Sequence, residues 1–186
     1  MTTLTSPEHL ITQVMRIVES DRKSEISLNA NGGNSILLVC PPDQEYKFIQ
    51  LLQTMLDKST YSVIDLNKIL ISFVQDNESE IYDAFELLQG AVHQIFKTPE
   101  GEESNDLFGL ILSSIEKAYH ENKVPVMIHS GALYGTGIDN LHLMESDLVM
   151  RSSKPLIILY PATHDGEKMM FLNTRPASKY RCMIVN

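Results

Sequence analysis

Short unbroken apolar runs alternate along this chain with longer segments whose apolar residues recur every three or four positions. The unbroken runs predict strands covered on both faces, and they lie at Ser35–Cys40, 61–66, Val124–Ile128 and 155–160. The helical periodicity predicts helices over 7–19, 44–56, 67–74, 79–97, 105–118 and 138–149. A polar stretch, 20–34, is expected to be an exposed loop.

This order predicts an α/β fold with a mostly parallel sheet and helices on both faces. Two short strands, 168–172 and 180–185, follow without a helix between them, which favours an antiparallel edge or hairpin at the C-terminus. The order of elements is similar to that of an ATPase core. A length of 186 residues with 43% hydrophobic content fits one domain spanning 1–186.

The charge balance bears on whether this protein binds nucleic acid. Fifteen basic and 24 acidic residues give a net charge of −9, which argues against direct nucleic-acid binding. A local group of basic residues near the C-terminus keeps that alternative open; it comprises Lys168, Arg175, Lys179 and Arg181. A solvated surface is the commoner role for such residues, although arginine also suits carboxylate or phosphate contacts.

Location and cofactor content follow from what the sequence lacks. The polar start, MTTLTSPEHL, is unlike a signal peptide, and no apolar run reaches the length of a membrane span, so a cytoplasmic protein is expected. Cys40 and Cys182 lie in apolar runs and are predicted to be buried, reduced thiols. With no CxxC or HxxxH pattern, no metal or other cofactor is expected.

Functional residues of a parallel sheet are expected in the loops after its strands. The loop after Ser35–Cys40 is PPDQEYK. A phosphate-binding loop needs glycines and free backbone N–H groups, whereas Pro41 and Pro42 have no N–H to donate. This loop is therefore predicted to be a turn that leads into a helix, and a P-loop is absent.

The loop after Val124–Ile128 begins with His129 and Ser130 and contains Gly131, Gly135 and Gly137. No GxSxG motif surrounds Ser130, so a structural loop is favoured over a nucleophile. Binding of an anion or a partner through exposed amides remains an intermediate hypothesis.

After the 155–160 strand comes PATHDGEK. His164 and Asp165 are candidates for a base and its orienting carboxylate, or for two metal ligands. The alternative is a tight turn at Asp165–Gly166 that leads into the next strand. A hydrolase or nucleotide-binding enzyme that uses His129, Ser130, His164 and Asp165 would need these two strand-end loops to lie side by side.

The C-terminal third, KPLIILYPATHDGEKMMFLN followed by SKYRCMIV, resembles the BrxB family of bacteriophage exclusion (BREX) defence systems. The matching positions are Tyr160, Pro161, Asp165, Gly166, Phe171, Tyr180 and Arg181. The chain departs from the family pattern at Ala162, His164 and Cys182. The resemblance is specific over about 124–186 and generic before that.

The resemblance implies a non-catalytic accessory or assembly component that acts through protein–protein interaction. Its implied partners are other defence components, such as a PglZ-like protein or a defence ATPase. The candidate binding surface consists of His129, Ser130, Tyr160, His164, Asp165, Arg175 and Arg181.

Overall fold

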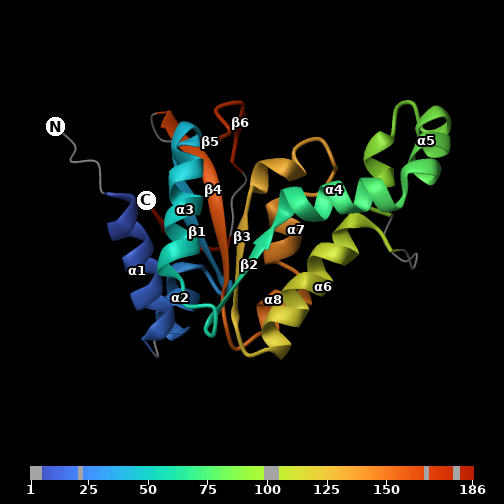
Figure 1. Ribbon diagram of the computed structural model, residues 1–186. Helices are drawn as coiled ribbons and strands as arrows, with labels where there is room; N and C mark the ends of the chain where they lie inside the picture. The colour runs from blue at the N-terminus through green and yellow to red at the C-terminus, as the bar shows by residue number, and fades with distance from the viewer. Residues whose placement is uncertain (1–5, 21–22, 99–104, 166–167, 178–180) are drawn as a thin grey trace.

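A five-stranded parallel sheet forms the centre of the protein (Figure 1). The computed structural model describes residues 6–20, 23–98, 105–165, 168–177 and 181–186. The strand order is β2-β3-β4-β1-β7. These strands are β2 (Tyr61–Asp65), β3 (Val124–Ile128), β4 (Leu156–Asp165), β1 (Ser35–Cys40) and β7 (Met183–Val185). The prediction of a mostly parallel α/β sheet is confirmed.

Helices cover both faces of this sheet (Figure 1). On one face lie α1 (Pro7–Glu19) and α3 (Glu45–Met55), with the 3-10 helix η1 (Pro42–Gln44) leading into α3. On the other face lie α4 (Leu66–Asp76), α6 (Leu107–His120), α7 (Asn140–Met144) and α8 (Asp147–Arg151). Two further 3-10 helices, η2 (Val92–Ile95) and η3 (Ser130–Leu133), belong to the connections.

The alternation of side chains along β1 explains the two layers of core. Ile36, Leu38 and Cys40 belong to the cluster beneath α1 and α3. Leu37 and Val39 belong to the cluster beneath α4, α6, α7 and α8. Because successive side chains of a strand point to opposite faces, an unbroken apolar run is what a strand between two helical layers requires.

The C-terminal strands differ in part from the prediction. Strand β4 continues through Asp165, so the segment expected to be a loop is extended, and it pairs antiparallel with β5 (Lys168–Phe171). β5 also pairs with the two-residue β6 (Arg175–Pro176). Short antiparallel strands are thus present, but β7 is not among them: it pairs parallel with β1 at the far edge of the sheet.

Two predicted helices are interrupted. The segment 79–97 is a ten-residue helix, α5 (Glu78–Leu87), a turn and then η2. The segment 138–149 divides into α7 and α8 because Ser146 caps a new helix: its hydroxyl accepts from the Val149 N–H at 3.4 Å. Helix α4 begins at Leu66, one residue before the predicted start, because Asp65 caps it: its carboxylate accepts from the Asn67 and Lys68 N–H groups.

The polar segment 20–34 is also more ordered than a loop. It contains α2 (Lys23–Asn29), whose one fully buried apolar side chain, Ile26, gives too little periodicity to detect. Asn34 is buried, and its side-chain amide donates to the carbonyls of Val149, Ser152 and Lys154 at 2.9, 3.1 and 3.0 Å. Gly33 lies directly against the Arg181 carbonyl, where a Cβ atom would come within 1.9 Å of the oxygen.

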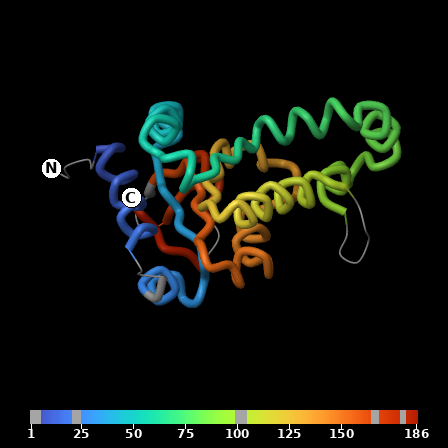
Figure 2. Tube along the Cα trace, turned by 60° about the horizontal axis from the view of Figure 1, so that its bottom comes forward, coloured from blue at the N-terminus to red at the C-terminus, as the bar shows by residue number. Residues whose placement is uncertain are grey.

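A helical arm extends away from the sheet (Figure 2). We define the arm as the outer part of α4, α5 and η2, residues 69–98. It lies at the end of the molecule farthest from α1 (Figures 1 and 2). None of the residues of α5 is buried.

Candidate functional sites

A histidine–aspartate pair lies where two neighbouring strands end. His129 immediately follows β3, and Asp65 is the last residue of β2, opposite Ile128 in the register. The Nδ1 atom of His129 lies 2.8 Å from Oδ1 of Asp65. His129 has a left-handed backbone conformation (φ 58°), which is uncommon for a residue with a side chain and occurs often at functional sites.

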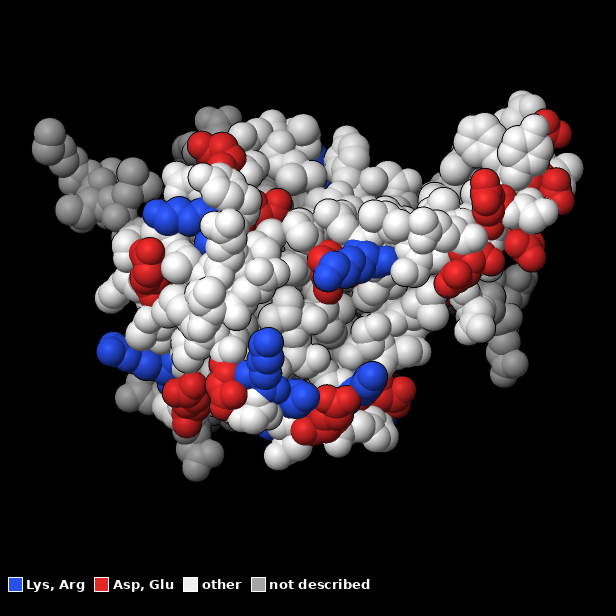
Figure 3. Space-filling view, viewed as in Figure 1, with Lys and Arg blue, Asp and Glu red and all other residues white. Residues whose placement is uncertain are grey.

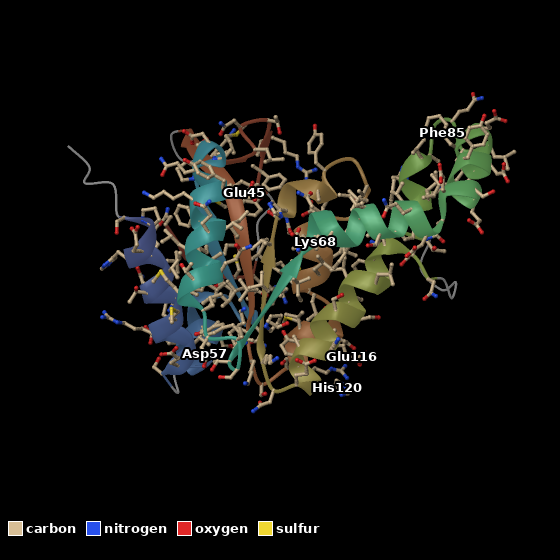
Figure 4. All side chains as sticks on the ribbon, viewed as in Figure 1. Glu45, Asp57, Lys68, Phe85, Glu116 and His120 are labelled. Carbon is tan, nitrogen blue, oxygen red and sulfur yellow. The ribbon has the colours of Figure 1, made fainter. Side chains whose placement is uncertain are left out.

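Glu45 adds a third ionisable group to this edge. It is the first residue of α3 (Figure 4), and its Oε1 atom is buried without a hydrogen-bond partner among the described residues. Burial raises the pKa of the Glu45 carboxyl, and the nearby His129 charge partly offsets this increase. Lys68 contributes a weak fourth charge, with its Nζ 4.0 Å from Asp65 Oδ2 in an exposed position. We name Glu45, Asp65 and His129 the strand-end cluster.

This cluster has the groups for acid–base chemistry, because a carboxylate that holds one imidazole nitrogen leaves the other free to exchange protons. The sequence prediction found His129 but missed Asp65 and Glu45. Asp65 was detectable as a carboxylate that ends an apolar strand. Glu45 lies in a helix's first turn, where an acidic residue is ordinarily explained by the helix dipole.

Ser130 lies beside the cluster in sequence but belongs to the core. Its side chain is fully buried, and its hydroxyl donates to the Leu159 carbonyl at 2.9 Å. Tyr160 is also fully buried and stacks on Phe171 with ring centroids 4.7 Å apart. Both side chains therefore support the packing between β3, β4 and β5.

The first of the two predicted strand-end loops packs against β4: η3 contacts this strand, and the Ser130 hydroxyl donates to the Leu159 carbonyl. In the register Val126 pairs with Ile157 and Met127 with Ile158, which places Tyr160 at the level of His129. His164 lies four residues further along β4, a separation of about 13 Å at the usual rise of a strand. The side chains of His164 and Asp165, and residues Gly166 and Tyr180, lie outside the described part of the protein.

The two candidate arginines each contact an acidic partner. Arg175 Nη2 lies 3.7 Å from Asp139 Oδ2, and the guanidinium lies 5.5 Å from the ring centroids of Tyr134 and Phe171. Arg181 Nε lies 3.9 Å from Glu145 Oε1. These contacts join the C-terminal segments to the part of the chain between β3 and α8. The acidic partners offset the positive charge of the two arginines.

The turn after β1 does not form a phosphate cradle. Pro41 and Pro42 enter η1, and the Gln44 N–H donates to the Pro41 carbonyl at 2.9 Å. The predicted helix-entry turn is therefore present. Within the described residues, no group of three or more His, Cys, Asp or Glu side chains is arranged to hold a metal ion. Both cysteines are buried and free, and burial raises the pKa of the Cys182 thiol to about 12 and that of Cys40 further.

The arm carries an exposed aromatic surface. Tyr82 and Phe85 lie three residues apart on α5, and their exposed fractions are 68% and 58%. Residues three apart share one face of a helix. Glu78 and Glu86 are exposed on the same helix, and we name these four residues the arm patch. Figure 3 shows acidic side chains around the outer end of the arm, and no basic side chain is visible at that end on the face in view.

No described helix combines the length and the apolar character that a membrane crossing requires. Comparison of the chain with protein-family models, with curated proteins and with solved structures gives no match.

Proposed function

We propose that this protein is a non-catalytic accessory or assembly component of a BREX-type phage-defence system. It acts by binding another defence component, such as a PglZ-like protein or a defence ATPase. The observation that carries the proposal is the arm patch, which exposes two aromatic rings on a helix that has no buried residue.

Three further observations support a binding role. Large apolar side chains exposed together typically mark sites of protein–protein interaction, and aromatic residues are the commonest energetic anchors of such sites. The sheet resembles the α/β scaffolds that bind nucleotides, yet Pro41 and Pro42 replace the amide donors of a phosphate loop. The segment that resembles BrxB also contributes β4, β5 and β7 to the sheet.

Co-purification tests this proposal. The tagged full-length chain would be expressed with each candidate defence component, and the complex isolated by affinity and size-exclusion chromatography. We expect a stable complex with at least one component. The double variant Tyr82→Ser/Phe85→Ser should abolish it, while Tyr46→Ser, an equally exposed tyrosine on α3, should not. If neither component binds the wild-type chain, the proposal is wrong.

A second candidate function, a hydrolase, is favoured by one observation: the 2.8 Å contact between His129 Nδ1 and Asp65 Oδ1. In such an enzyme Asp65 orients the imidazole, the free Nε2 atom removes a proton from water, and Glu45 supplies a proton or a charge. Ser130 takes no part because its hydroxyl donates to a core carbonyl.

Hydrolysis assays distinguish this candidate from the first. Wild-type protein would be tested on p-nitrophenyl acetate and p-nitrophenyl phosphate across pH 5 to 9. An enzyme should lose about a hundredfold or more in rate with His129→Gln and with Asp65→Asn. Equal slow rates for the wild type and both variants would exclude catalysis at the strand-end cluster.

A further inference from the structure

The arm is strongly acidic. Residues 69–98 contain five acidic residues and one basic residue, Lys97, so the arm has a net charge of −4 in a chain whose net charge is −9. The acidic residues are Asp76, Glu78, Glu80, Asp83 and Glu86. All five are exposed. Their negative charge is therefore on the surface, where a bound partner would meet it.

The two exposed rings lie on one face of α5. Tyr82 and Phe85 share a face because they lie three residues apart, and Glu78 lies one turn before Tyr82. Leu87 is exposed by 84%, but it lies two residues after Phe85 and therefore points to the opposite side of α5. Figure 4 places Phe85 at the outer end of the arm.

The inner side of α5 contacts the rest of the arm and leaves a groove. This groove has a volume of about 350 Å³, and its lining combines apolar side chains, among them Phe73 and Ile81, with polar ones that include Glu80 and Asp106. The arm therefore presents apolar surface next to carboxylates on more than one side. A partner that matches it needs apolar side chains flanked by positive charge.

We infer that the arm patch binds a basic amphipathic segment of a partner protein, in which apolar side chains contact Tyr82 and Phe85 while flanking Lys or Arg side chains pair with Glu78 and Glu86. This inference rests on the proposed function, because it specifies what kind of protein segment the arm patch binds. The charge argument decides among occupants: a second copy of the chain would bring another acidic arm, with a charge of −4, to the contact, and nucleic acid would bring phosphates.

A peptide titration tests the inference without knowledge of the partner. The probe is a fluorescein-labelled amphipathic 18-residue peptide of leucine and lysine, and its control has glutamate in place of lysine. Fluorescence anisotropy with the full-length protein should show binding of the lysine peptide only. Raising the salt from 50 to 300 mM should weaken binding about fivefold or more, because surface charges are screened.

Matched variants locate the contact. Tyr82→Ser/Phe85→Ser should weaken peptide binding at least tenfold, and Glu78→Gln/Glu86→Gln should weaken it at low salt and reduce its salt dependence. Leu87→Ser, on the opposite side of the same helix, and Tyr46→Ser, on α3, should each change it less than twofold. Equal binding by wild type and the double aromatic variant, or binding of the glutamate peptide, would overturn the inference.

Two further results separate this inference from the proposed function. If a defence component binds the double aromatic variant as well as it binds wild type, the inference is wrong and the proposed function stands. If the lysine peptide binds the arm as described but no defence component co-purifies, the inference stands and the proposed function is wrong. Concentration-dependent dimerisation that the aromatic variant abolishes would assign the patch to a second copy and overturn the inference.

Discussion

Strand β1 and helix α5 each contain five apolar residues but have opposite environments. Every residue of β1 is buried, whereas no residue of α5 is. β1 is enclosed by β4 and β7 at its sides and by helices on both faces, while α5 projects beyond the end of the sheet (Figure 1). The comparison teaches that apolar residues specify a strand or a helix locally, but the neighbouring elements decide whether they stabilise the fold or remain available to a partner.

Two phenylalanines provide the sharpest test of this comparison. Phe48, on the buried face of α3, is 2% exposed, and Phe85 is 58% exposed on the arm. Phe48→Ala should lower the free energy of unfolding by about 3–5 kcal/mol, because it removes a packed ring and leaves a cavity. Phe85→Ala should change it by less than about 0.5 kcal/mol. Urea denaturation of both variants checks the pair, and similar losses would mean that α5 packs as part of the core.

The comparison also explains how far sequence reasoning succeeds. The β1 segment was predicted with its bounds because unbroken apolar runs determine a doubly covered strand. The 79–97 segment was predicted as one helix because its apolar stripe is periodic throughout. Periodicity does not reveal where a helix stops, and Gln89–Gly90 end α5 before η2 begins. Nor does it reveal that Tyr82 and Phe85 have no layer to pack against.

The candidate site was predicted only in part for a related reason. His129 was identified because it follows an apolar strand, but its contact with Asp65 and its electrostatic interaction with Glu45 depend on the order β2-β3-β4-β1-β7. That order brings together residues 64 and 84 positions apart in sequence. The predicted end of the strand at Tyr160 was wrong, because β4 extends through Asp165 and carries His164 further along the sheet from the level of His129.

The backbone at Gly33 lies directly against the backbone at Arg181, so Gly33 allows a second comparison of the packed centre of the protein with the arm. A Cβ atom there would lie 1.9 Å from the backbone oxygen of Arg181, next to β7, so the two segments must separate in Gly33→Ala. We expect a loss of about 2–3 kcal/mol, typical of an overpacked site. The control is Gly90→Ala beside α5, where a Cβ atom meets nothing within 4 Å. Thermal unfolding of the two variants measures the difference, and equal midpoints would contradict this account.

Asn34 tests whether buried polar contacts hold the layers together. Asn34→Ala leaves the carbonyls of Val149, Ser152 and Lys154 without this donor. We expect a loss of about 1–3 kcal/mol, because a buried acceptor deprived of its partner retains its desolvation cost. Asn29→Ala removes one exposed bond to the Glu25 carbonyl and should cost under about 0.5 kcal/mol. Urea midpoints for both would show the effect, and a larger loss at Asn29 would refute the assignment.

The smallest expected effect concerns Glu45, which lies between the two regions: part of the core wall and part of the strand-end cluster. Burial raises the pKa of its carboxyl, so the folded state holds this proton more tightly than the unfolded state does. The charged form therefore costs stability above the raised pKa, and this cost disappears as the pH falls below the ordinary glutamate value of 4.5. Glu45→Gln should stabilise the protein at pH 7, by less than about 1 kcal/mol because the side chain keeps contact with water, and should have little effect at pH 4.

Urea denaturation of wild type and variant at the two pH values checks the sign, with the exposed Glu80→Gln as control. A loss of stability at pH 7 would instead mean that the charged carboxylate is held by His129 and belongs to a built acid–base site.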